Sequence, residues 1–333
     1  MSKRNIAILI LAPLGLAFAS MFIGRYSMDL VTIIRAFGAR FFAIPADLPD
    51  TVYSVLFNIR LPRIIMAMAV GAALSVSGAS FQGMFKNPLV SPDILGVSAA
   101  AGFGAALAIL MGGNAALIQL FAFIFGLIGV ILAYLISRVY RTTPALMLVL
   151  SGVVVSAFFS ALISVIKFIA DPFQKLPAIT FWLMGTLGDV TGSDLLLALP
   201  PIILGTAGLL AVRWRLNVLA MGDEEARSLG VKTELLKGFI ILCATVVTAS
   251  AVCVSGVIGW VGLIIPHVGR MLVGPDHKAL LPASISIGAC YLLIMDNIAR
   301  TAISAEIPLG ILTAILGAPF FAYLLRKTKG GWQ

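Results

Sequence analysis

The sequence contains little charge for its length. Only 11% of its 333 residues are Asp, Glu, Lys or Arg, whereas 60% are hydrophobic. A soluble domain carries about 25% charged residues, so the composition excludes a soluble globular protein and predicts an all-α polytopic membrane protein. The Lys and Arg residues, which outnumber the acids, flank apolar runs, where they orient a chain in the bilayer. We therefore expect no binding to nucleic acid.

Residues for metal, redox or nucleotide chemistry are also scarce. The cysteines Cys243, Cys253 and Cys290 lie singly in apolar stretches, and the histidines His267 and His277 form no cluster with metal-ligand spacing. We expect no metal site, no cofactor and no enzyme active site in this chain. No Gly-Lys dipeptide occurs, so the chain lacks a P-loop for phosphate. Work driven by ATP would need a separate ATPase.

Uncharged runs long enough to cross a bilayer, about 20 residues each, divide the chain. The run 94–137 is long enough for two spans with a turn at 112–114, and the run 238–269 holds one span to about Ser255, followed by a short broken segment. Counting that segment predicts ten spans in a single domain, 1–333. Both basic ends then lie in the cytoplasm. The other runs are 5–24, 64–85, 142–166, 195–212, 279–295 and 307–325.

A polar island at 213–238 interrupts the apolar chain. Nine charged residues lie between Arg213 and Lys237, whereas the 18 residues before them and the 32 after them have none. Gly222 and Gly230 bracket good helix formers, which predicts a short helix capped by Gly230. The island must face water, either as a loop that joins two spans or as a docking surface for a soluble partner.

A short sequence echo indicates an inverted internal repeat. Val76-Ser77-Gly78 followed by Pro88 matches Val254-Ser255-Gly256 followed by Pro266 at the same spacing. On the predicted topology five crossings separate the two copies, so they cross the bilayer in opposite directions. Inverted repeats are typical of transporters.

Short motifs rich in glycine and proline recur from about residue 50 to residue 327. They are Leu61-Pro62-Arg63, Gly71-Ala-Ala-Leu-Ser-Val-Ser-Gly78, Phe81-Gln82-Gly83, Asn87-Pro88-Leu89, Pro92-Asp93-Ile94-Leu95-Gly96, Phe181-Trp182-Leu183-Met184-Gly185, Gly262-Leu263-Ile264-Ile265-Pro266-His267 and Leu316-Gly317-Ala318-Pro319. With these motifs the chain resembles the permease subunits of the ABC importers for iron-siderophore complexes, cobalamin and haem.

The resemblance implies a type II ABC importer permease fold and a homodimer, or a dimer of similar subunits, in a bacterial inner membrane. Two cytoplasmic ATPase subunits, which bind ATP and Mg, would dock on one side. A periplasmic substrate-binding protein would deliver the cargo on the other. The cargo would be a bulky metal chelate of the iron-siderophore kind, with cobalamin, haem and an oxyanion such as molybdate left open.

The resemblance also assigns residues to the two docking sides. The polar island matches the family's coupling helices, and its expected ATPase contacts are Gly222, Glu224, Glu225, Ala226, Arg227, Leu229 and Gly230. On the other side, Arg60, Arg63 and Arg300 match arginines that face acidic residues of the binding protein. Alternatively, these long side chains reach from the span ends to the membrane interface. Replacing both Arg60 and Arg63 by Glu is expected to leave the fold intact and to weaken docking.

Small hydroxyl residues are the candidates for the translocation path. Ser151, Ser156, Ser160 and Ser164 of the fifth span would line it, or would instead pack helices together. Thr142 and Thr143 are the candidates for the inner gate. The rival function is a secondary transporter driven by an ion gradient. That function would need carboxylates buried near the middle of spans, and the sequence has none there.

Overall fold

Helices form almost all of the chain. The structure, a computed structural model, describes residues 3–42, 44, 47–138 and 144–327, and no strand occurs among them. The helices before the polar island are α1 (Lys3–Ser20), α2 (Leu30–Phe42), α3 (Asp50–Tyr53), the π-helix η1 (Ser54–Arg60), α4 (Leu61–Phe85), the 3-10 helix η2 (Pro92–Leu95), α5 (Val97–Leu110), α6 (Ala115–Ser137), α7 (Ala145–Ile169), α8 (Lys175–Met184) and α9 (Gly192–Ala211). The remaining helices are α10 (Arg213–Met221), α11 (Asp223–Ser228), α12 (Thr233–Ser255), α13 (Val261–Val273), α14 (His277–Thr301) and α15 (Leu309–Lys327).

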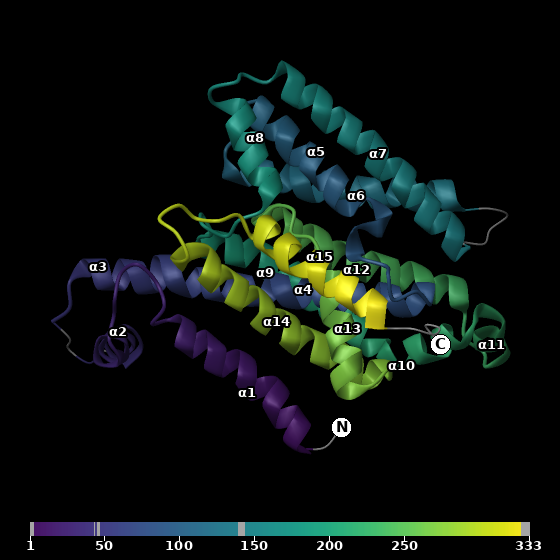
Figure 1. Cartoon of the computed structure of the whole chain (residues 1–333), viewed down its shortest axis with the longest axis horizontal. Helices are drawn as coiled ribbons and strands as arrows, with labels where there is room; N and C mark the ends of the chain where they lie inside the picture. Colours follow the sequence, from purple (N-terminus) through teal and green to yellow (C-terminus); the bar gives the residue numbers. More distant parts are fainter. Residues whose placement is uncertain (1–2, 43, 45–46, 139–143, 328–333) are drawn as a thin grey trace.

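Helix α4 lies at the centre of the molecule. Figure 1 shows it running between α14 and α1 on one side and a layer formed by α5, α6 and α7 on the other. Most of its residues are buried, including the polar Ser75, Ser77 and Ser80. Two of these serines donate hydrogen bonds to carbonyls one turn earlier in the helix. The third, Ser77, donates to the carbonyl of Ala244 in α12 at 3.3 Å, so all three hydroxyls have protein partners.

Glycines let α4 approach its neighbours closely. A Cβ atom on Gly78 would overlap the carbonyl oxygen of Gly262 in α13, and one on Gly71 would overlap the carbonyl oxygen of Gly288 in α14. Small residues at such crossings allow helices in a membrane to pack backbone against backbone. The glycine motifs of the sequence thus serve helix packing at these two crossings.

The predicted spans correspond to helices, but not all of them are long. Among the described residues, six helices are long and apolar enough to cross a membrane. Four shorter apolar helices, α1, α5, α13 and α15, account for the other predicted spans. The 13 residues of α13 rise about 20 Å, less than the hydrocarbon thickness of about 30 Å. A crossing at α13 would therefore have to include the non-helical residues 256–260 before it.

The start of α1 and the end of α15 both lie towards the α11 end of the molecule (Figure 1). Ser20, at the end of α1, donates a hydrogen bond to Asn297 near the end of α14. The backbone N–H of Leu309, at the start of α15, donates to the carbonyl of Gly185, the residue after α8. The start of α15 also lies at the end away from α11 (Figure 1). This arrangement agrees with an even number of crossings.

The sequence echo does not mark equivalent positions in the backbone. Gly78 lies inside α4, seven residues before the helix ends at Phe85, whereas Gly256 is the residue that ends α12 and has a positive φ of 66°. The match was therefore wrong in register. What does occur twice is a pattern of helices: long helices α4 and α12 are each followed by an irregular segment and a short helix, α5 or α13.

Candidate functional site

The polar island folds into two short helices. The predicted helix between Gly222 and Gly230 is α11. Its end is closed by two hydrogen bonds, from the N–H of Gly230 to the carbonyl of Arg227 and from the N–H of Val231 to that of Ala226, both 2.9 Å. Gly230 has a φ of 80°, which a residue without Cβ adopts at little cost. The helix α10 before it was not predicted.

The expected ATPase contacts divide into exposed and buried residues. Glu224, Glu225, Arg227 and Gly230 are exposed, as is Leu229, with 64% of its surface accessible. In contrast, Gly222 and Ala226 are buried, and Ala226 is 0% exposed. These two positions place α11 against the rest of the chain, and in this arrangement they offer no surface to a partner.

Polar contacts join α11 to the first turns of the long helix α12. Buried Lys237 of α12 forms an ion pair with Asp223 at the start of α11. Arg227 donates from Nε to Thr233 Oγ1 at 3.1 Å and lies 3.8 Å from Glu234. A displacement of α11 would therefore be transmitted directly to the first turns of α12.

Helix α10 is tied to α14 by a second set of contacts. Asn217 donates from its amide to Asp276, 2.6 Å away, and its oxygen accepts from the backbone N–H of His277 at 2.8 Å. The His277 ring is buried next to Gly83 of α4. Hydrogen bonds from the backbone N–H of Lys278 and from the Asn217 amide lower the pKa of Asp276, so its carboxylate is charged at neutral pH. The island thus contacts three of the helices that surround or form the core.

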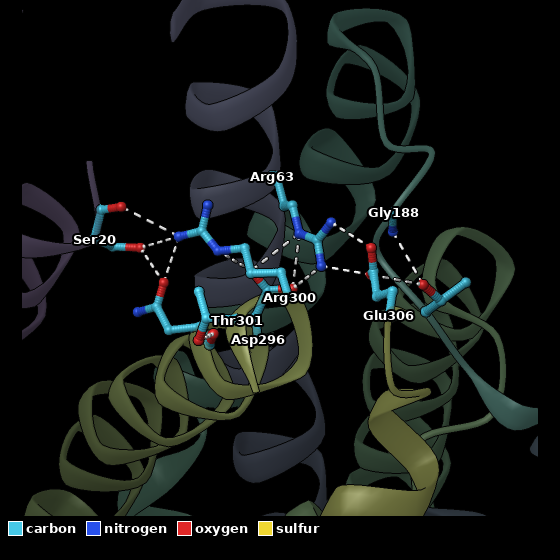
Figure 2. Close-up of polar contacts among 9 residues, drawn as sticks. Ser20, Arg63, Gly188, Asp296, Arg300, Thr301 and Glu306 are labelled. Carbon is cyan, nitrogen blue, oxygen red and sulfur yellow. Dashed lines mark hydrogen bonds and ion pairs between the residues drawn. The ribbon is translucent and has the colours of Figure 1, made fainter. Parts of the chain in front are cut away.

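At the opposite end of the molecule, a buried ion-pair network joins α4 to α14 and to the loop before α15. Figure 2 shows Arg63 between Asp296 and Glu306. Its Nε lies 2.9 Å from Asp296 Oδ1, and its Nη2 lies 2.6 Å from Glu306 Oε1. Asp296 is 0% exposed. A charge removed from water to this degree is tolerated because it is paired and hydrogen-bonded.

The loop after α8 also reaches the network. Thr186 donates from its hydroxyl to Glu306 at 3.2 Å and accepts from the N–H of Gly188 (Figure 2). Burial raises the pKa of Glu306, but its hydrogen bonds with Arg63 and the nearby guanidinium charge outweigh this effect, so the pKa lies below the ordinary value. Glu306 is therefore a charged partner of Arg63 at neutral pH.

The other two predicted arginines lie beside this network. Arg60 is 3% exposed and donates to the carbonyls of Met21 and Tyr26. Arg300 donates to the backbone and hydroxyl oxygens of Ser20, at 3.1 and 2.8 Å. The structure thus brings the three predicted arginines together. They line a cavity of about 270 Å³, whose other lining residues are Gly24, Arg25, Tyr26, Val55, Ile59 and Glu306.

This geometry corrects one expectation drawn from the sequence. Arg63 is buried, so replacing it with Glu would set a third carboxylate against Asp296 and Glu306. The substitution would leave fully buried Asp296 with only Arg300, 3.8 Å away, as a counter-ion and would take the hydrogen-bonded partner from half-buried Glu306. Breaking a buried pair in this way costs several kcal/mol. Charge reversal at Arg63 is therefore expected to damage the fold, and the resulting variant could not report on docking alone.

The serines predicted to line the path do not share one face of α7. Ser151 is buried at 2% exposure, whereas Ser160 and Ser164 are exposed and Ser156 is half-buried. Ser156, Ser160 and Ser164 are spaced four residues apart, so they form one stripe. Of the four predicted serines, only these three are accessible to line a path or to contact another chain. Thr142 and Thr143 lie outside the described residues.

Sequence reasoning missed Glu306 and the partners of the arginines. Glu306 is the only acidic residue after Asp296 in the sequence, and an isolated acid at the boundary of an apolar run is a signal that could have been followed. In the described part of the chain, no group of three or more His, Cys, Asp or Glu residues could hold a metal ion.

Comparison with known proteins places this helical architecture, with polar clusters at its two ends, in a class. A solved structure of a protein assigned to the metal-chelate type of ABC transporter, in an inward-facing conformation, matches with a TM-score of 0.88 and 40% identity. The match covers 98% of this chain and all of that one. The chain is thus a membrane-spanning permease of the ABC transporter class. A model of the FecCD transport family matches residues 9–327, and the chain belongs to that family.

Relatives with different named cargoes are similar to nearly the same extent. The "Molybdate import system permease protein MolB" of Haemophilus influenzae is 43% identical over 315 residues, 95% of this chain and 93% of that protein. The "Probable iron chelatin transport system permease protein" of Helicobacter pylori is 44% identical over 277 residues, 83% of each chain. The "Cobalamin import system permease protein BtuC" of Halobacterium salinarum is 42% identical over 282 residues, 84% of this chain and 76% of that protein.

Proposed function

We propose that this chain is the translocation subunit of an ATP-driven importer that moves a bulky metal chelate, of the iron-siderophore kind, into the cytoplasm. It works as a homodimer in a bacterial inner membrane, with both termini in the cytoplasm. Two ATPase subunits bind ATP and Mg and supply the energy. This chain has no catalytic site and no cofactor of its own. The Helicobacter relative named for iron chelatin transport supports the choice of cargo.

One observation carries the coupling part of the proposal. Helix α11 presents exposed Glu224, Glu225 and Arg227, and two ion pairs join the same helix to α12. An ATPase that grips this surface would move the first turns of the membrane helices as it closes on ATP. The proposed contacts are the exposed members of the predicted set.

The arginine cluster is the proposed docking side for the binding protein. Arg60, Arg63 and Arg300 line one cavity at the end opposite α11. Carboxylates of a partner would be attracted to this basic cavity, and such pairs mainly speed and orient encounter. The serine stripe of α7, together with Thr142 and Thr143, is proposed for the path and the inner gate. The bulk of the cargo favours such a path of small side chains.

The main rival function fits the geometry less well. A secondary transporter needs an ionisable group that binds and releases its coupling ion within the membrane. Among the described residues, Asp296 is fully buried, but it is paired with Arg63 near the end of α14. A carboxylate neutralised by a guanidinium is a poor binding site for a cation.

The test is reconstitution into liposomes with the ATPase and binding protein encoded beside this chain. Binding-protein-stimulated ATP hydrolysis and uptake are measured across ferric siderophores, cobalamin, haem and molybdate. The proposal expects ferric siderophore to stimulate both activities. The similarity to MolB makes molybdate the second candidate, and stimulation by molybdate alone would replace the chelate. Uptake without the ATPase would contradict the importer mechanism itself.

A further inference from the structure

A large cavity opens between three helices near the island. It measures about 820 Å³ and lies between α1, α4 and α14. Its walls are apolar, with Leu9, Ile10 and Pro13 from α1, Met68, Ala69 and Ala72 from α4, and Ala279, Pro282, Ile285, Ser286 and Ala289 from α14. None of these residues belongs to the two docking sides described above.

The cavity exposes part of a helix that is otherwise enclosed. Most of α4 is buried, yet Met68, Ala69 and Ala72 are only partly covered. Ile10, on the α1 side, has 56% of its surface accessible. Protein interiors are close-packed, and an apolar space of this size beside spanning helices is open to the hydrocarbon of the bilayer. An acyl chain of a bilayer lipid would fill this space.

The mouth of the cavity is basic. Arg213, the first residue of α10, and Lys278, in the first turn of α14, both line it. Neither side chain forms a salt bridge with any residue in the described ranges. The third charged residue there, Asp276, already accepts hydrogen bonds from Asn217 and from the backbone of Lys278. The charge of Asp276 is close enough to Lys278 for the two to attract each other, but two cations against one carboxylate leave the mouth with a net positive charge that favours an anion.

We propose that this cavity binds one anionic phospholipid. The phosphate lies against Arg213 and Lys278, and one acyl chain extends along Met68, Ala69 and Ala72. Basic pockets between membrane helices are suited to anionic headgroups, and the apolar walls continue from the basic mouth in the same cavity. Because Arg213 begins α10, the bound lipid would also steady the start of the helix whose Asn217 is tied to α14.

A second groove, on the other side of α10, provides a matched control. It measures about 610 Å³ and also contains two basic residues, Arg215 and Lys232. Its walls include Trp214, Leu229 and Leu235. Leu229 is one of the residues proposed to contact the ATPase, and no residue of α4 lines this groove. Removing its two charges changes the net charge as much as removing Arg213 and Lys278, without altering the cavity.

The experiment titrates the purified, delipidated full-length chain with phosphatidylglycerol or phosphatidylcholine of identical acyl chains. Bound lipids are counted by native mass spectrometry. The wild-type chain is expected to bind one phosphatidylglycerol much more tightly than phosphatidylcholine. The variant Arg213→Gln/Lys278→Gln should lose about 30-fold in affinity for phosphatidylglycerol, from roughly 1 kcal/mol for each basic residue. The variant Arg215→Gln/Lys232→Gln should keep the wild-type preference.

Filling the cavity tests the position of the chain separately. The variant Ala69→Leu/Ala72→Leu retains both charges but occupies the apolar walls, and it should reduce binding of both lipids. Equal affinity of the wild-type chain for the two lipids would overturn the proposal, as would equal losses in the two charge variants. If the cavity is instead covered by the ATPase or by a second copy of this chain, the isolated chain will bind phosphatidylglycerol no more tightly than phosphatidylcholine. These readouts use neither cargo nor ATP, so they stand apart from the proposed transport function.

Discussion

The two ends of this permease use charge in different ways. At the α11 end, Glu224, Glu225 and Arg227 are exposed, and the ion pair of Arg227 with Glu234 is 3.8 Å long and open to solvent. At the opposite end, Arg63 and Asp296 are buried against each other at 2.8 Å. The first arrangement leaves charged side chains accessible to a partner, whereas the buried pair of the second stabilises the fold. In the sequence, both are simply charges beside apolar runs.

The largest expected effect comes from breaking the buried pair. Replacing Arg63 with Met removes the hydrogen-bonded counter-ion of Asp296 and Glu306, and leaves beside Asp296 only the more distant guanidinium of Arg300, 3.8 Å away. Removing one partner of a buried ion pair costs about 3–5 kcal/mol. We expect a loss of this size in the unfolding free energy measured in mixed micelles. The double variant Arg63→Met/Asp296→Asn should lose less than the sum of the two single variants, and a loss below about 1 kcal/mol for Arg63→Met would contradict the assigned role.

A smaller effect is expected at Lys237, the buried charged residue among the polar contacts between α11 and α12. Its partner Asp223 is 40% exposed on its side chain and can be rehydrated. Replacing Lys237 with Met removes a charged hydrogen bond, worth about 1–3 kcal/mol. The same unfolding measurement applies. The control is Lys232→Met, at an exposed lysine directly before α12. Equal effects for the two lysines would show that the ion pair of Lys237 with Asp223 contributes nothing to the unfolding free energy.

The pH dependence of stability should report the contribution of the Glu306 carboxylate. Its pKa in the folded chain is lowered from 4.5, so its contribution is fully present above about pH 4.5 and is lost as the pH falls through the lowered pKa. The wild-type chain should therefore exceed Glu306→Gln in stability at pH 6, and the difference should shrink towards pH 3. Thermal unfolding of both proteins across this range provides the measurement. A difference that grows on acidification would have the wrong sign.

The smallest effect on stability is expected from Arg227, whose side chain is 52% exposed. Exposed ion pairs contribute about 0–1 kcal/mol. Arg227→Ala should hence unfold almost as the wild-type chain does, while it weakens co-purification with the ATPase. A variant that is destabilised as strongly as Arg63→Met would remove the distinction between the two ends.

Local patterns in the sequence predicted much of the fold. The apolar runs located the spanning helices, the turn at 112–114 falls between α5 and α6, and Gly230 ends α11. Helix α10 was missed because its first turn alternates bulky and basic residues without an apolar periodicity. The shortness of α13 was evident only as a group of glycines, whose effect depends on packing against α4.

The candidate site was less predictable, because its main contacts join residues far apart in the chain. Arg63 and Glu306 are separated by 243 positions, and no local pattern pairs them. Ser151 could have been separated from Ser156, Ser160 and Ser164 by helical periodicity alone, since Ser151 lies on the opposite face of α7 from the stripe. The exposure of Leu229 and the burial of Ala226 follow from the docking of α11 against its neighbours, which required the structure.

The most direct test of the account is the accessibility of position 224. A Glu224→Cys variant, with the three native cysteines replaced by alanine, is labelled by a membrane-impermeant maleimide in right-side-out and inside-out vesicles. The account predicts labelling in inside-out vesicles only, and protection when the ATPase subunit is bound. Labelling in right-side-out vesicles, or labelling that the bound ATPase does not reduce, would contradict the claim that α11 is the cytoplasmic docking surface.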